Sequence, residues 1–208
     1  MREGLTAKTF RYKDELLTFA EAHKLEANHA YLSEIKAYRE SFSSFDDLHG
    51  AGPLARLSDP LEWLKETEDF ALGRNLPDGY VPASQYILFR KHSENKHDEL
   101  KTEAAEFEVG DKILAMLQLR HKLSDYLMKF GGHIGYSVHV DERQKGYGSL
   151  ILELVLDEAL DLGIDKLLVT CNSDNLASKK VILNNDGKYE SSLQEDNGRT
   201  VERYWINL

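Results

Sequence analysis

Apolar residues in the first third of the chain recur at helical spacing. Between Tyr12 and Ala27 they include Leu16, Leu17 and Ala20. A second run extends from Tyr31 to Phe42 and repeats at intervals of three and four residues. Such spacing places apolar side chains on one face of a helix. We therefore expect two amphipathic helices in this part of the chain.

A third helix is indicated by its start and stop signals. Asp59 precedes Pro60, which is a favourable pair for an N-cap and the first helical position, and Gly73 follows as a stop. The preceding stretch, Ser43 to Ser58, contains Gly50, Gly52 and Pro53 and is expected to be a loop. Leu76 to Gly79 is a turn signal.

After this turn the pattern changes to short runs of β-branched and aromatic residues. Ser84 to Arg90, Lys112 to Arg120 and His133 to Val140 are expected to be strands. The stretch between the first two, His92 to Gly110, is rich in charged residues and is expected to be an exposed hairpin connection or a mobile insertion. His121 to Phe130 connects the second strand to the third.

The last part of the chain alternates between helical and strand patterns. Ser149 to Leu162 carries one apolar stripe and predicts an amphipathic helix. Lys166 to Thr170 contains a continuous apolar run, which is typical of a strand buried on both faces. Asn175 to Asn184 predicts another helix, and Arg203 to Ile206 a final strand. This order favours a mixed α/β sheet (α+β mixed) flanked by helices.

Composition narrows the class of protein. Hydrophobic residues make up 41% of the 208 residues, enough for a packed core. The net charge of −10 and the lack of a basic cluster argue against a nucleic-acid partner. No stretch approaches the roughly 20 apolar residues of a membrane span, and no signal-like segment begins the chain, so we expect a cytoplasmic protein. A single cysteine, Cys171, excludes a multi-cysteine zinc site, and no metal is expected.

The motif that carries chemistry is a glycine-rich turn between a strand and a helix. It consists of the residues Arg143, Gln144, Lys145, Gly146, Tyr147 and Gly148. Unpaired N–H groups at the start of a helix bind phosphates, and glycine allows the close approach. A dinucleotide fingerprint would need a third glycine where Ile151 stands, and the Gly-Lys-Ser/Thr of a P-loop is absent. The spacing alone leaves open a second interpretation, a strand-to-helix turn that binds no ligand.

The block His133 to Gly187 resembles the core of the GNAT superfamily of N-acetyltransferases. The family signature Arg/Gln-x-x-Gly-x-Gly/Ala is matched by Arg143, Gly146 and Gly148. Asn175 and Ser178 match the Asn-x-x-Ala/Ser that begins the second helix of that family. The run Gly131 to Tyr136 also resembles a bacterial subgroup of predicted acetyltransferases. The resemblance implies the acyl-CoA N-acyltransferase fold, with acetyl-CoA as cosubstrate.

The resemblance also implies roles for particular residues. Backbone amides of Gln144 to Gly148 would hold the pyrophosphate, and Asn175 and Ser178 would face the pantetheine arm. The backbone of Ser137, Val138, His139 and Val140 would pair with that arm as an added strand. An N–H near Ser137 or Val138 would stabilise the oxyanion.

The usual proton donor of the family is absent. Many members carry a tyrosine seven residues after the asparagine, and here that position is Ile182. The candidates for acid–base chemistry are His133, Tyr136 and Tyr204, with His121 and His139 as further histidines. Cys171 has no paired histidine and is expected to be a packing residue, and Tyr189 lies too far along the chain to replace the missing tyrosine.

The expected organisation has two parts. Residues 1–83 form a helical N-terminal segment that packs on the same domain and contributes to the acceptor side, and residues 84–208 form the GNAT core. Trp63, Tyr80 and Tyr126 are candidates for the lining of the acceptor pocket, although aromatic packing is the favoured interpretation of each. Because the final strand is exposed in this fold, a homodimer is a further expectation.

The resemblance implies an N-acetyltransferase that moves acetyl from acetyl-CoA to a primary amine of a small molecule or peptide. The missing tyrosine leaves a second hypothesis, a catalytically silent acyl-CoA-binding module with a sensing or scaffold role. O-acetylation would need a base to activate a hydroxyl, and the sequence offers no evident one.

Overall fold

The computed structural model describes residues 7–44, 48–92 and 106–208. Most of the charged stretch His92 to Gly110 lies outside the described residues, so its predicted exposure stays a prediction. Within the described ranges, no helix is both long and apolar enough to cross a membrane.

The described strands form one mixed sheet of eight strands in the order β1-β2-β3-β4-β5-β6-β8-β7. Neighbouring strands are antiparallel except β5 and β6, which are parallel. The strands are β1 (Ala7–Tyr12), β2 (Glu15–Glu21), β3 (Ala83–Arg90), β4 (Lys112–Arg120), β5 (Ile134–Val138), β6 (Lys166–Asn172), β7 (Lys188–Gln194) and β8 (Thr200–Asn207).

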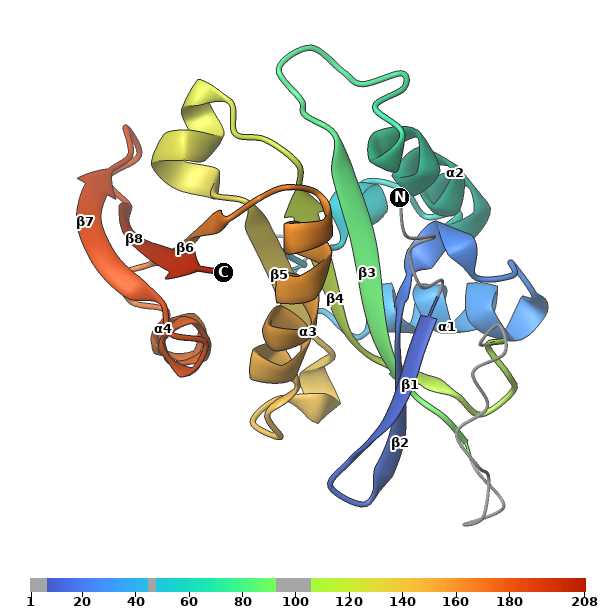
Figure 1. Ribbon diagram of the computed structural model, residues 1–208. Helices are drawn as coiled ribbons and strands as arrows, with labels where there is room; N and C mark the ends of the chain where they lie inside the picture. The colour runs from blue at the N-terminus through green and yellow to red at the C-terminus, as the bar shows by residue number, and fades with distance from the viewer. Residues whose placement is uncertain (1–6, 45–47, 93–105) are drawn as a thin grey trace.

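Helices cover both faces of this sheet (Figure 1). They are α1 (His29–Glu40), α2 (Pro60–Ala71), α3 (Tyr147–Asp161) and α4 (Leu176–Asn184). Short 3-10 turns occupy Ala22–Lys24, Gly52–Ala55 and Val140–Glu142, and a π-helical turn occupies Leu127–Gly131.

Most elements expected from the periodicity are present. The helix expected from Tyr31 is α1, and the helix expected after Asp59 is α2, with the Asp59 carboxylate accepting the Leu61 N–H at 2.9 Å as its N-cap. The two C-terminal helices and the expected strands are present with ends shifted by a few residues. The mixed α/β fold is therefore confirmed.

The helix expected from Tyr12 to Ala27 is wrong. This segment completes β1 and forms β2, an antiparallel hairpin that turns at Lys13, whose φ is 54°. In β2, Leu17 and Phe19 pack on one face of the sheet and Ala20 on the other. A strand buried on both faces gives a continuous apolar run, and such a short run cannot be told from a buried helix by spacing.

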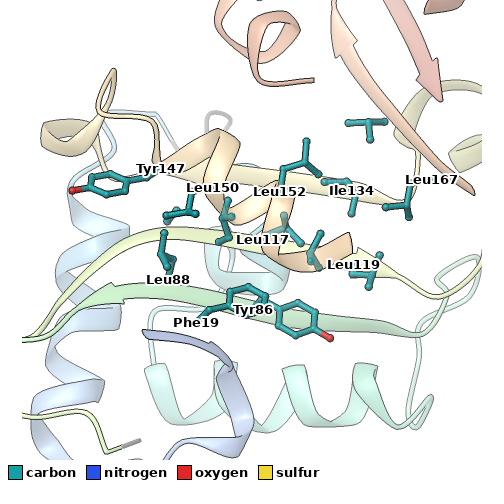
Figure 2. Close-up of a cluster of buried hydrophobic side chains, with 14 of the residues drawn as sticks. Phe19, Tyr86, Leu88, Leu117, Leu119, Ile134, Tyr147, Leu150, Leu152 and Leu167 are labelled. Atoms are coloured by element: carbon teal, nitrogen blue, oxygen red, sulfur yellow. The ribbon is translucent and has the colours of Figure 1, made fainter. Parts of the chain in front are cut away.

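The sheet separates two hydrophobic cores. One lies under α3 and α4 and includes Leu117 and Leu119 of β4 packed against Leu150 and Leu152 of α3 (Figure 2). The other lies under α1 and α2, where Trp63 is fully buried. Figure 1 shows α3 on the opposite face of the sheet from α1 and α2. The N-terminal elements thus share both their sheet and a core with the rest of the described chain.

Besides β1 and β2, a third strand, β7, was missing from the sequence prediction. β7 pairs with β8 at the edge of the sheet, and its sequence Lys-Tyr-Glu-Ser-Ser-Leu-Gln is mostly exposed. An edge strand with few buried side chains leaves almost no hydrophobic pattern, so periodicity does not find it.

Candidate functional site

The turn Arg143 to Gly148 lies where β5 leads, through a short 3-10 turn, into α3. Gln144 and Gly146 have φ values of 65° and 100°, so two residues of the turn are in the left-handed region. Gly146 is the N-cap of α3 and has no side chain with which to cap the first N–H groups. Backbone N–H groups in such alternating conformations form a concave nest for anions, and the helix dipole adds positive potential. The turn has the geometry of a phosphate-binding loop.

The β1–β2 hairpin supports this loop from its other side. Lys13 Nζ donates to the carbonyl oxygen of Lys145 at 2.9 Å. A Cβ atom on Gly146 would lie 2.7 Å from the Tyr12 hydroxyl, and the Tyr147 hydroxyl donates to Glu15. The contact is between residues more than 130 positions apart, and the helix predicted for this segment concealed it.

A buried carboxylate, Glu142, anchors the start of the loop. Its oxygens lie 3.1 Å from Arg90 Nη2, 3.0 Å from Lys112 Nζ and 2.7 Å from Lys145 Nζ. Burial by itself would raise the pKa of Glu142, but hydrogen bonds from Lys145, Arg90 and Lys112 outweigh it and lower the pKa to about 2. Glu142 therefore ties β3, β4 and the loop together as an ionised group, and no sequence signal pointed to it.

One edge of β5 is open beside this loop. β5 pairs with β6 only at Ile134 and Val169, so the two strands have no further register partners toward their C-terminal ends. His139 N–H donates to Leu114 O, and in an antiparallel pair the bonded positions alternate. The backbone N–H and C=O groups of Tyr136 and Val138 consequently point toward β6 and away from β4.

Two contacts agree with this alternation. Ser137 O accepts from the Tyr38 hydroxyl at 3.0 Å on the α1 side. Val138 O lies 3.5 Å from Arg143 Nε, within reach of a donor from outside the sheet. The sequence analysis expected the backbone from Ser137 to Val140 to pair with a ligand. Of these four residues, the structure directs the backbone groups of Val138 toward the opening. The other residue of β5 whose backbone groups face the opening is Tyr136.

The start of α4 closes the other side of the opening. Asn175 Oδ1 accepts the Ser178 N–H at 3.0 Å as the N-cap. Ser178 Oγ in turn lies 2.9 Å from the Tyr136 hydroxyl. Burial raises the pKa of Tyr136 to about 12, against a smaller lowering by the Ser178 hydrogen bond. Three residues that the sequence singled out, Asn175, Ser178 and Tyr136, are thus brought together.

Residues 62–188 match the family described as the acetyltransferase (GNAT) domain, which is more than half of the 208 residues. The chain belongs to the GNAT acetyltransferase family. A comparison with curated proteins finds no match.

Solved GNAT acetyltransferases share this fold at low sequence identity. RimL, a ribosomal L7/L12 alpha-N-protein acetyltransferase in complex with coenzyme A, is 15% identical over 97% of this chain and 98% of its own, with a TM-score of 0.60. The microcin C7 self-immunity acetyltransferase MccE, in complex with acetyl-CoA and AMP, is 16% identical over 94% of each chain, with a TM-score of 0.59. The GNAT domain of S. lividans PAT is 14% identical over 100% of each chain, with a TM-score of 0.61.

The position of the missing tyrosine is part of the core in this GNAT protein. Ile182 is fully buried and packs with the residues under α3 and α4. Its side chain therefore stabilises the fold and can offer no proton.

The three histidines considered as bases have structural partners. His133 Nδ1 accepts the Leu168 N–H at 2.9 Å, and burial with nearby Arg120 lowers the His133 pKa to about 4. His139 Nδ1 accepts the Asp141 N–H at 3.2 Å, and His121 Nε2 lies 3.0 Å from Ser84 Oγ. Burial lowers the pKa of both. All three are held as neutral rings that join loops to strands.

Tyr204 and Cys171 are protonated at neutral pH. Burial, together with a hydrogen bond to Glu202, raises the pKa of Tyr204 to about 12, and Glu202 is paired with Lys179 at 2.9 Å. Burial, with a smaller effect of Glu202, raises the pKa of the Cys171 thiol to about 11. The exposed Tyr189 stacks edge-on against Tyr204 at 5.6 Å between ring centroids. A thiolate nucleophile at Cys171 is therefore disfavoured.

A cavity of about 570 Å³ opens on the α2 side of the sheet. Tyr80 and Tyr126, two of the three aromatic candidates, line it, but Trp63 does not and is a packing residue as favoured. Trp63 is fully buried and its Nε1 donates to Ala51 O at 2.8 Å, because α2 turns this side chain into the core. Between residues 7 and 208, outside the three undescribed segments, no group of His, Cys, Asp or Glu side chains could hold a metal ion.

Proposed function

We propose that this GNAT protein is an N-acetyltransferase that moves the acetyl group of acetyl-CoA to a primary amine of a small molecule or peptide. The observation that carries the proposal is the open edge of β5 next to the left-handed loop before α3. The RimL and MccE structures contain CoA and acetyl-CoA, respectively, which supports the same donor for this chain.

Each part of the donor has a group suited to it. Amides of Gln144 to Gly148 bind the pyrophosphate at the start of α3. The backbone groups of Tyr136 and Val138 pair with the pantetheine amides as an added strand does. One of these N–H groups donates to the carbonyl oxygen of the thioester as it becomes an oxyanion. The amine nitrogen attacks the carbonyl carbon, the C–S bond breaks, and the departing thiolate takes a proton.

The Tyr136 hydroxyl is our candidate for that proton. It lies at the opening between β5 and α4, and its pKa of about 12 keeps it protonated at neutral pH. Ser178 Oγ lies 2.9 Å from the hydroxyl, and because either oxygen can be the donor of this hydrogen bond, the Tyr136 O–H can turn toward the departing thiolate. Tyr136 would thus supply from β5 the proton that many relatives supply from the position of Ile182.

The position of the donor site can be tested with a matched pair of variants at Gln144, which is exposed and has a φ of 65°. Gln144→Val places a β-branched residue in the left-handed region, and Gln144→Gly adopts it freely. Any residue with a Cβ, the wild-type Gln144 included, pays roughly 1–2 kcal/mol for a left-handed conformation, and a β-branched residue tolerates it least. We therefore expect Gln144→Val to bind acetyl-CoA more weakly than the wild type and Gln144→Gly to bind it at least as tightly, with roughly 5- to 30-fold or more between the two variants in calorimetry. Equal affinity of the two variants would place the pyrophosphate elsewhere.

Turnover is tested by release of the CoA thiol with a panel of primary amines. We expect release that depends on the amine, and a loss of about 100- to 10,000-fold in kcat for Tyr136→Phe, in the range of general acid catalysis. Its KM for acetyl-CoA should change little. Acetyl-CoA binding without thiol release for any amine would favour the silent acyl-CoA-binding module instead.

A further inference from the structure

Arg120, at the end of β4, is a cation without a carboxylate partner in a protein of net charge −10. Its Nη1 donates to Gly131 O at 2.9 Å and to Gly132 O at 3.1 Å. Across the described ranges, no Asp or Glu pairs with it, and its hydrogen bonds are those of Nη1, which leaves Nε and Nη2 open. Burial lowers the pKa of Arg120, opposed only by Tyr126. A guanidinium remains charged in proteins, so this charge is left uncompensated.

The guanidinium connects the cavity with the reacting part of β5. Arg120 lines the cavity of about 570 Å³ together with Gln118 and Tyr126. Its Nη2 lies 3.5 Å from the position that a Cβ atom on Gly135 would occupy. Gly135 precedes Tyr136, and neighbouring strand residues are only about 3.3 Å apart along the strand. With the ~3 Å of a hydrogen bond to Nη2, a bound anion would therefore lie within roughly 10 Å of the Tyr136 backbone, beside which the proposed thioester lies.

Besides Arg120, three charged side chains line the cavity, namely Arg56, Glu66 and Asp78. Arg56 forms an ion pair with Glu66, and both line the same cavity. Arg56 is therefore a matched control for Arg120, because it has the same charge and cavity but a carboxylate partner.

We infer that Arg120 binds a carboxylate of the acceptor, so that the acceptor is a small molecule whose amine and carboxylate are a few bonds apart, as in a free amino acid. This inference rests on the proposed acetyl transfer and names its substrate class. A guanidinium presents two parallel N–H groups to a carboxylate, and Nε and Nη2 are the pair left open here. The 3.5 Å between Nη2 and the Cβ position of Gly135 favours a spacer of only a few bonds between the two groups.

The experiment compares free amino acids with their primary carboxamides, which keep the amine and lose the negative charge. With acetyl-CoA saturating, thiol release should give a kcat/KM about 10- to 100-fold higher for the acids, as expected for a charge-assisted hydrogen bond. Arg120→Gln should remove this preference and leave the KM for acetyl-CoA unchanged. Arg120→Lys should keep part of it, and Arg56→Gln all of it. Equal rates for acids and amides, or turnover of amidated peptides alone, would overturn the inference.

A binding measurement separates this inference from the proposed function. Calorimetry with CoA-saturated protein compares N-acetylglycine with N-acetylglycinamide, and needs no turnover. Preference for the acid in the wild type, reduced in Arg120→Lys and lost in Arg120→Gln, supports the carboxylate site even where no amine releases thiol and the transferase proposal fails. Equal binding of the two probes to the wild type would overturn the inference. This comparison needs only the wild type, so it remains a valid test even if a variant does not fold.

Discussion

Replacing Glu142 by glutamine tests how far its ion pairs stabilise the fold around the turn Arg143 to Gly148. The Glu142 side chain is 6% exposed and contacts Arg90, Lys112 and Lys145. Its pKa falls from 4.5 to about 2, and a factor of ten in a protonation constant is about 1.4 kcal/mol, so the ionised form is stabilised by about 3 kcal/mol. Since the three cations are partly exposed and screened, we expect Glu142→Gln to lower the free energy of unfolding by about 2 kcal/mol at pH 7.

The pH dependence gives this prediction its sign. A carboxylate whose pKa is depressed by folding contributes stability above its unfolded pKa, and the contribution is lost as the pH falls through its folded pKa. In urea denaturation, the gap between wild type and Glu142→Gln should stay constant from pH 7 to about 5. It should then narrow between pH 4.5 and about 2. A gap below about 0.5 kcal/mol at pH 7, the size of an exposed ion pair, or a gap that widens in acid, would refute the reasoning.

Two further outcomes follow from buried groups. His133 has a pKa of about 4 in the folded protein and binds a proton more readily when the protein is unfolded. The free energy of unfolding should therefore fall by up to about 3 kcal/mol as the pH drops from 6.5 to 4. In urea denaturation, His133→Phe should make the free energy of unfolding less dependent on pH in this range, and an unchanged pH dependence would contradict the prediction. Trp63→Ala should lower the free energy of unfolding by about 3–5 kcal/mol. Tyr80→Ala removes an exposed aromatic side chain and should lower it far less. Similar decreases for the two variants in thermal or urea denaturation would show that Trp63 is not a core residue.

The turn Arg143 to Gly148 illustrates which features could be predicted from the sequence. The run Arg143 to Gly148 is local, and its glycines, the following apolar stripe and the cap at Asn175 all act within a few residues. Their consequences, a left-handed turn at Gly146 and the N-terminus of α3, could therefore be predicted from spacing and resemblance. The same holds for α2, where Asp59 and Pro60 fix the start.

Contacts between distant segments were out of reach. Lys13 reaches Lys145, and Glu142 gathers three cations from β3, β4 and the loop. No periodic pattern encodes such pairs, because each of these residues is a charged residue of a type that is common on protein surfaces. The hairpin of β1 and β2 was mistaken for a helix for a related reason, since burial on both faces removed the alternation that marks a strand.

The sequence by itself determined the mixed α/β class, the glycine-rich turn before α3 and the absence of the usual tyrosine at Ile182, because these depend on local patterns. Only the tertiary structure decided that Tyr136 meets Ser178 beside the open edge of β5, and that Arg120 has no carboxylate partner at the cavity. The physical reason is that strand pairing and burial, which set hydrogen-bond direction and uncompensated charge, arise from segments far apart in the chain.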